Sequence, residues 1–255
     1  MRRALSGFVF IVILSACGGG GGGSYGGGSV PPIQIANTAL PFYLPLAAGN
    51  TWTFATGGRM VDAGSGTLSC TCPGDGYRTE RIQLYQPGSS TVSSSFFFTK
   101  NTPSGATQLT NVVGVENGSG TGSITIVSIP QYPYGIPVMD DSPRQGESWN
   151  DGAGDSSTIT SVGGTLMLSN SSKIIDVASD TISGSNLSTV TWSFAKGVGF
   201  TQIGVGTQST NLTSFFVNTT TSYAVARQGE PVPIFHGRTG RVDAATALRP
   251  IFALR

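Results

Sequence analysis

Short runs in which apolar and polar residues alternate recur along the chain. In one such run Val190, Trp192 and Phe194 occupy alternate positions between hydroxyl side chains, which predicts a strand with one dry and one wet face. Trp52 and Phe54 alternate in the same way. Further runs of this kind are residues 81–85, 123–126, 165–168 and 173–177, and two continuously apolar runs that suit central strands are 96–98 and 212–217.

Gly, Ser, Asn and Pro separate these runs, which is the spacing of an antiparallel sheet. Charged residues make up only 11% of the 255-residue chain, and this composition opposes long solvent-facing helices; only 244–248 suggests a short one. The chain is therefore predicted to be all-β, with one antiparallel domain of about ten strands over residues 31–226. A curved sheet, a half-barrel or a sandwich would satisfy this pattern.

Two segments of the chain echo each other. Each has a proline and then a glycine three residues before a tryptophan, Gly49 before Trp52 and Gly146 before Trp149. Glycine can take the positive φ of a turn that enters a strand, and a tryptophan at that point can cover the end of a sheet. The echo predicts two related halves, with coincidence in a glycine-rich chain as the alternative.

The N-terminus has the pattern of a signal peptide, predicted for residues 1–16. Arg2 and Arg3 precede an apolar run, 4–14, that is too short to span a bilayer as a helix. The run ends in Leu14-Ser15-Ala16-Cys17, which resembles the lipobox of bacterial lipoproteins. In that family the cysteine thiol receives a diacylglyceryl group, the preceding bond is cut and the new α-amine is acylated. An ordinary secretory signal with an incidental cysteine is the alternative.

Residues 17–30 are predicted to be a flexible tether that follows the lipidated Cys17, because a glycine run of this kind cannot fold alone. Acyl chains on Cys17 would make a membrane the first partner of the protein. The lipoprotein resemblance also implies sorting to the outer membrane, since Gly18 stands where an Asp would favour retention at the inner one.

A second resemblance covers about residues 43–205. The stretch Tyr43-Leu44-Pro45-Leu46-Ala47-Ala48-Gly49-Asn50-Thr51-Trp52, the start Gly146-Glu147-Ser148-Trp149 and the stretch Ala195-Lys196-Gly197-Val198-Gly199-Phe200 are similar to motifs in a widespread group of bacterial lipoproteins. Phe200 departs from the usual Leu. The group has no established activity, so the resemblance implies an all-β lipoprotein fold and supplies no catalytic residues. Gly197 and Gly199 are expected to mark a tight turn between strands.

Residues suited to catalysis are few, and we expect no enzyme activity, no cofactor and no metal. The single histidine, His236, lies in a tail rich in Pro and Arg, and Asp140 and Asp141 should point to opposite faces of an extended chain. Residues 150–155 carry oxygen ligands and glycines, yet they lack the ligand spacing of a calcium loop, so a hairpin turn is favoured.

Cys70 and Cys72 are a candidate disulfide, because an envelope address is oxidising. Cysteines two residues apart on a strand lie near the limit of disulfide reach, and Pro73 and Gly74 could supply the necessary bend. Free thiols are the alternative.

The tail, residues 227–255, is basic, with five Arg against Glu230 and Asp243. It is predicted to dock on its own acidic domain, because Ile251, Phe252 and Leu254 favour burial. Binding to lipopolysaccharide phosphates is the alternative, and the envelope location disfavours nucleic acid.

The sequence as a whole predicts a membrane-anchored cell-envelope lipoprotein whose β domain binds or supports without catalysing. The alternatives are a carrier of an apolar ligand, such as a lipid or acyl chain, and a cell-envelope hydrolase. The candidate ligand face consists of Trp52, Phe54, Trp192 and Phe194. These side chains either form an ordinary closed core or line an open groove for an apolar or glycan ligand.

Overall fold

The computed structural model describes residues 34–35, 42–68, 77–101, 109–117, 125–126, 136–150, 156–184, 187–218 and 244–252. The chain divides into two compact units, Met1–Pro31 and Pro32–Arg255, and every described residue belongs to the second.

Strands make up most of the described chain. They are β1 (Gln34–Ile35), β2 (Thr51–Phe54), β3 (Arg59–Leu68), β4 (Tyr77–Tyr85), β5 (Val92–Asn101), β6 (Leu109–Asn117), β7 (Thr125–Ile126), β8 (Ile136–Asp140), β9 (Ser148–Asn150), β10 (Ser156–Met167), β11 (Lys173–Gly184), β12 (Leu187–Ala195), β13 (Gly199–Val205) and β14 (Gln208–Phe216). Two short helical pieces follow, α1 (Ala244–Leu248) and η1 (Arg249–Phe252).

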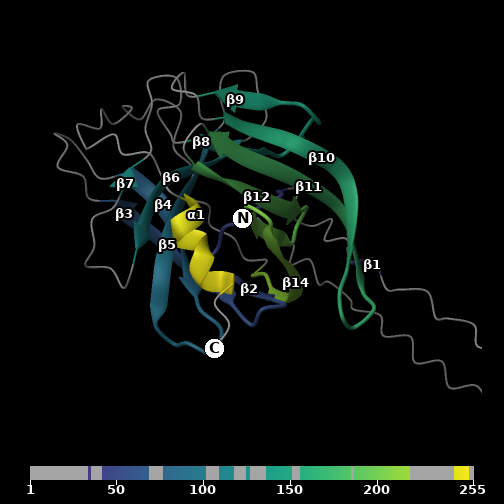
Figure 1. Cartoon of the computed structure of the whole chain (residues 1–255), viewed down its shortest axis with the longest axis horizontal. Coiled ribbons are helices and arrows are strands. Elements are labelled where there is room, and N and C mark those ends of the chain that lie inside the picture. The colour runs from purple at the N-terminus through teal and green to yellow at the C-terminus, as the bar shows by residue number, and fades with distance from the viewer. Residues whose placement is uncertain are drawn as a thin grey trace, which may run out of the picture. The chain divides into compact units, whose positions relative to one another are not determined.

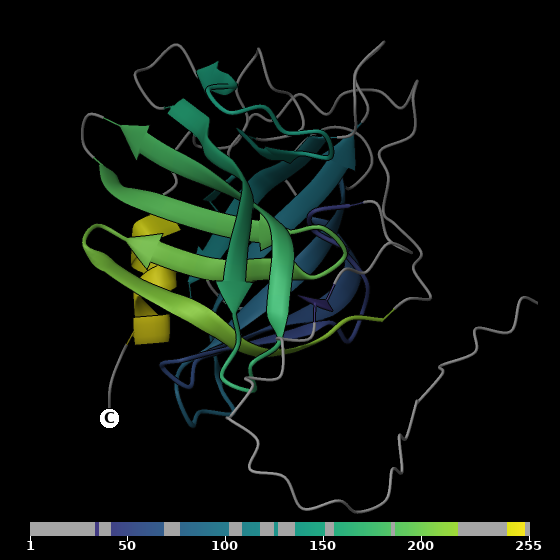
Figure 2. The same cartoon turned by 90° about the vertical axis from the view of Figure 1, so that its right-hand side faces the viewer.

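These strands form one sheet, with the order β7-β6-β5-β4-β3-β2-β14-β13-β12-β11-β10-β9. Only β1, beside β11, pairs in parallel among the described strands; β8 pairs with β6. The pairing of β2 with β14 joins two antiparallel meanders, one from β2 to β7 and the other from β9 to β14. The two meanders face each other as two layers in Figure 2. Because β8 also lies against β10 and β11, the sheet is nearly closed into a barrel.

The predicted all-β antiparallel class is confirmed, with 14 described strands where about ten were expected. The additional strands include β3 and β6, whose sequences lack a simple alternation. Backbone hydrogen bonds to neighbouring strands hold such segments in the sheet whatever their side-chain pattern.

The two echoing segments make the same turn. Gly49 and Gly146 have φ values of 90° and 86°. The N–H of Gly49 donates to the carbonyl of Asp62, and the N–H of Asp62 donates to the carbonyl of Asn50, both at 2.8 Å. In the second segment the N–H of Gly146 donates to the carbonyl of Ile159, and the N–H of Ile159 donates to the carbonyl of Glu147, also at 2.8 Å. Each meander therefore starts on the same backbone arrangement, as two related halves require.

The C-terminal helix is where the sequence placed it, at Ala244–Leu248. In Figure 1 it lies between β4–β6 on one side and β12 and β14 on the other. Ile251 is fully buried and Phe252 packs against the core, so this part of the tail docks on its own domain as predicted. We call residues 244–252 the plug.

Candidate functional site

The candidate ligand face lies inside the barrel and is closed. Trp52, Phe54, Trp192 and Phe194 are at most 1% exposed. The ring of Trp192 lies 5.3 Å from Phe96, 5.5 Å from Phe98, 6.2 Å from Phe194 and 5.6 Å from Phe200, measured between centroids. Of the two arrangements that the sequence allowed, the structure has the packed core, with aromatic rings in edge and tilted contacts.

Trp52 is locked against the turn between β12 and β13. Its Nε1 donates to the carbonyl of Val198 at 2.7 Å. A methyl group on Gly199, whose φ is +93°, would lie 2.6 Å from that same nitrogen. Gly197, with a φ of 71°, forms the tight turn expected here. Both glycines are therefore needed, one for the turn and the other for close contact with Trp52.

Residues 42–50, which we call the strap, cross one end of the barrel. The N–H of Gly197 donates to the carbonyl of Phe42 at 2.8 Å. The N–H of Tyr43 donates to Asp141 Oδ1 at 3.2 Å, and that of Ala47 donates to Asp62 Oδ2 at 2.8 Å. The strap is therefore tied to three different parts of the fold, once through its own carbonyl at Phe42 and twice through N–H groups that donate to carboxylates.

The end of the strap is fixed by Asn50, which is fully buried. Its Nδ2 donates to the carbonyl of Pro45 at 2.8 Å, and its Oδ1 accepts from the N–H of Asn218 at 2.7 Å. One amide side chain thus ties the strap to the end of β14. Of the three motifs that are similar to those of bacterial lipoproteins, the first supplies most of this strap and Trp52, and the third supplies the turn that Trp52 contacts, so these residues have a structural role in the domain.

Beneath the strap lies a buried cluster of ionisable groups. Lys100 is fully buried, with its Nζ 4.2 Å from the centroid of Phe42. Burial lowers the pKa of Lys100 to about 8, while the nearby Asp141 opposes that shift. Burial, followed by the charges of Asp176 and Asp141, raises the pKa of Tyr43. With Phe42 over it, the ammonium group holds the strap by a cation–π contact.

Three carboxyl groups in or near the interior have raised pKa values, and burial is the largest cause for each of Asp62, Asp141 and Asp180. Asp180 lies opposite Trp192 in the sheet and is fully buried. Its Oδ1 accepts from Ser157 Oγ at 2.8 Å, but its Oδ2 has no hydrogen-bond partner among the described residues. A carboxyl group in this position favours its protonated form.

We expect the free energy of unfolding to fall as the pH rises from about 5 to about 8. In this range an ordinary carboxyl is already ionised in the unfolded chain, whereas burial raises the pKa of Asp180 well above 3.8, so the folded chain releases this proton only at a higher pH. Folding therefore takes up protons, and the stability present at low pH is lost as the pH rises through the folded-state value. Urea unfolding at both pH values measures the difference.

The matched test is Asp180→Asn, which removes the titration and keeps an acceptor for Ser157. Its stability should change less between the two pH values than that of the parent chain. Asp176→Asn, at an exposed position of the same strand, is the control. An Asp180→Asn chain with the parent's full pH dependence would contradict this assignment.

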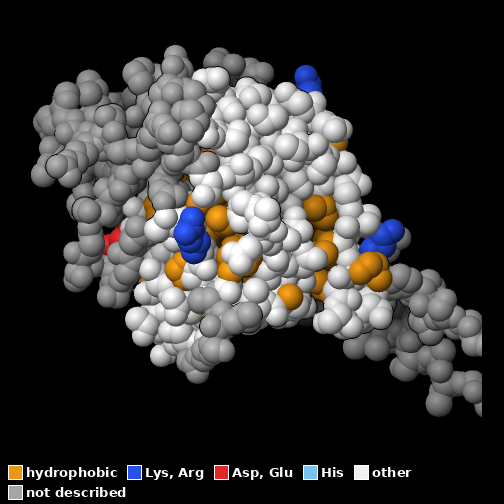
Figure 3. Space-filling view, viewed as in Figure 1, with side chains coloured by type: hydrophobic (Ala, Val, Ile, Leu, Met, Phe, Trp, Pro, Cys, Tyr) orange, Lys and Arg blue, Asp and Glu red, His pale blue; other side chains and the backbone are white. Residues whose placement is uncertain are grey.

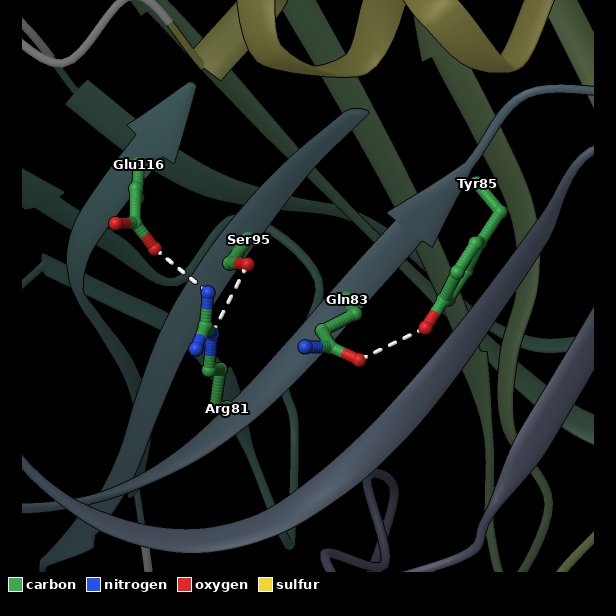
Figure 4. A network of polar contacts seen from close by, with 5 residues as sticks. All are labelled: Arg81, Gln83, Tyr85, Ser95 and Glu116. Carbon is green, nitrogen blue, oxygen red and sulfur yellow. Dashed lines mark hydrogen bonds and ion pairs between the residues drawn. The ribbon is translucent and has the colours of Figure 1, made fainter. Parts of the chain in front are cut away.

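The outer face of β4–β6 carries a polar network (Figure 4). Arg81 Nη2 lies 2.8 Å from Glu116 Oε2, and Arg81 Nε donates to Ser95 Oγ at 3.1 Å. Farther along β4, Tyr85 donates its hydroxyl to Gln83 Oε1 at 2.9 Å. These groups partner one another across neighbouring strands, so the network stiffens the outside of the sheet.

Several predicted positions lie outside the described residues: Cys17, Cys70, Cys72 and His236. Nowhere in the part of the chain that the structure describes do three His, Cys, Asp or Glu side chains gather as metal ligands. Within the same ranges, no helix combines the length and the apolar character needed to cross a bilayer.

Sequence reasoning missed the buried ionisable groups. Lys100 follows Phe96 and Phe98 at strand spacing, so the period of two places it on the interior face. The same parity places Asp180 beside Ala178 on the interior side of β11. Alternation was therefore a usable signal, although a charged residue on a dry face is rare enough to be overlooked.

Comparison of the chain with family models, with curated proteins and with solved structures finds no match.

Proposed function

We propose that the protein is a cell-envelope lipoprotein, held on the outer membrane by acyl chains on Cys17, whose β domain binds or supports without catalysing. The observation that carries the proposal is the lipobox Leu14-Ser15-Ala16-Cys17 followed at once by a glycine-rich tether. A flexible glycine-rich linker is suited to joining an anchor to a domain that acts at a distance from it.

The described domain is consistent with a binding or structural role. Its interior is filled by aromatic rings, and its buried ionisable groups hold the strap and the sheet together. Figure 3 shows a face with mostly uncharged polar surface and few charged side chains, which suits contact with neutral partners better than with nucleic acid. If the domain instead carried an apolar ligand, part of this packed interior would have to open to admit it.

Cys17→Ser should release the protein from the membrane fraction, because its acyl chains are the proposed anchor. Membranes prepared from cells expressing the parent and the variant are washed with high salt and probed for the protein. The parent is expected in the pellet and the variant in the wash.

Cys72→Ser is the matched control, since it removes a thiol elsewhere in the chain and should leave the protein in the pellet. A Cys17→Ser protein that stays bound after the salt wash would show that something other than acylation holds the chain to the membrane.

A further inference from the structure

The plug and the strap lie at opposite ends of the barrel. Strand β5 runs from one to the other: at its start Ser94 Oγ donates to the carbonyl of Ala247 at 2.7 Å, and near its end Lys100 lies under Phe42. The strap is held by several hydrogen bonds to buried groups, whereas this bond from Ser94 joins the plug to the wall of the sheet.

The plug presents a narrow apolar surface to the interior. Ala245, Ala247, Leu248 and Ile251 are each at most 1% exposed. The plug consists of a five-residue α-helix and a four-residue 3-10 helix. Helical pieces of this length are not stable alone, so the plug keeps its shape only while it is docked.

The buried part of the plug combines two features, an apolar strip and one carbonyl oxygen that accepts from Ser94. A fatty acyl chain has the same two features, a slender apolar body and a carbonyl oxygen at one end. Ser94 is fully buried and lies two positions before Phe96 on β5, so its hydroxyl group marks the boundary of the aromatic interior. In Figure 3 hydrophobic atoms reach the surface around the place that α1 has in Figure 1.

We propose that the plug end of the barrel is a binding site for one fatty acyl chain, and that the plug occupies this site until an acyl chain displaces it. The proposal rests on the proposed function, because it names a ligand and a site for a domain that binds without catalysing. On displacement, the acyl carbonyl takes the Ser94 hydrogen bond and the chain replaces the side chains of Leu248 and Ile251.

In this proposal the plug and the acyl chain compete for the same site, and this competition sets the apparent affinity of the domain for the acyl chain. The plug is part of the same chain, so it competes at a high effective concentration, and only the fraction of molecules with an undocked plug can bind. Weakening the docking of the plug should therefore strengthen acyl binding. If the plug were a permanent part of the core, weakening its docking would not increase the affinity for an acyl chain.

Gly58 offers a selective way to undock the plug. A methyl group at this position would lie 2.5 Å from Ile251 Cγ1 and 3.0 Å from the Ile251 carbonyl oxygen. Gly58 does not have a positive φ, so Ala fits its backbone and the conflict falls on the plug alone. Gly204→Ala is the matched control, because its methyl group would make an ordinary 3.4 Å contact with Thr191.

The test titrates a fluorescent long-chain fatty acid into residues 17–255 carrying Cys17→Ser, so that neither detergent nor the chain's own acyl groups compete. Gly58→Ala should bind at least about tenfold more tightly than this parent, and Gly204→Ala should match the parent. Adding Ser94→Ala to Gly58→Ala should remove part of the gain. A folded Gly58→Ala chain that binds no more tightly than the parent would overturn the proposal.

A second measurement keeps the test valid if Gly58→Ala does not fold. Hydrogen exchange in 244–252 of the same parent should become faster when palmitate saturates the protein, because the plug is released. Unchanged or slower exchange at saturation would overturn the proposal. Either failure leaves the membrane fractionation of Cys17→Ser untouched, so the ligand assignment and the proposed function can fail separately.

Discussion

Gly199→Ala is expected to destabilise the domain by about 2–5 kcal/mol, because it adds backbone strain to a steric conflict in the core. The new methyl group would lie 2.6 Å from Trp52 Nε1 at a φ of +93°. Trp52 would have to leave its place and lose the hydrogen bond to Val198. A loss of this size is a large fraction of the stability of a typical domain.

Gly206→Ala separates the two causes. Gly206 also has a positive φ, +59°, but a methyl group there would meet nothing within 4 Å. It should cost only about 1–2 kcal/mol, the price of the backbone conformation alone. Urea unfolding followed by tryptophan fluorescence measures both variants. Equal losses for the two would show that contact between Gly199 and Trp52 does not matter to the fold.

Trp192→Ala should cost about 3–5 kcal/mol, the range for removing a large buried aromatic side chain. Trp192 is fully buried and in ring contact with Phe96, Phe98, Phe194 and Phe200, so its removal leaves a cavity in the middle of the barrel. Thermal unfolding followed by circular dichroism measures the loss.

Trp192→Phe is the informative companion, because it fills most of the cavity and the one polar atom that it removes, Nε1, has no hydrogen-bond partner among the described residues. It should cost much less than Trp192→Ala. Phe216→Ala, at a side chain that is 63% exposed, should change stability by no more than about 0.5 kcal/mol. A Trp192→Ala chain as stable as the parent would contradict the closed core.

The strands with one dry face could be predicted because their pattern is local. Trp52 with Phe54, and Trp192 with Phe194, alternate with polar residues and occupy β2 and β12 as expected. The turns before Trp52 and Trp149 could be predicted for the same reason, since Gly49 and Gly146 are needed within their own segments.

Features that depend on distant segments could not be predicted. Residues 160–163 in the middle of β10 are all exposed, and the register of β10 with β11 shifts on either side of Ser161, so this part of the strand has no alternation of burial that a sequence pattern could reveal. Whether the aromatic face would close depended on β2 meeting β14, a pairing that no local pattern reveals. Alternation along β5 places Lys100 on the interior face, but its neighbours there, Phe42 and Asp141, could not be predicted because they come from the strap and from the residue after β8.

The most direct test of the central claim is the intact mass of the protein extracted from its own envelope. If Cys17 is the anchor, the mass should correspond to a chain that starts at Cys17 and carries a diacylglyceryl group on the thiol and a third acyl chain on the α-amine. A mass equal to the bare polypeptide, or a chain that still contains residues before Cys17, would contradict it.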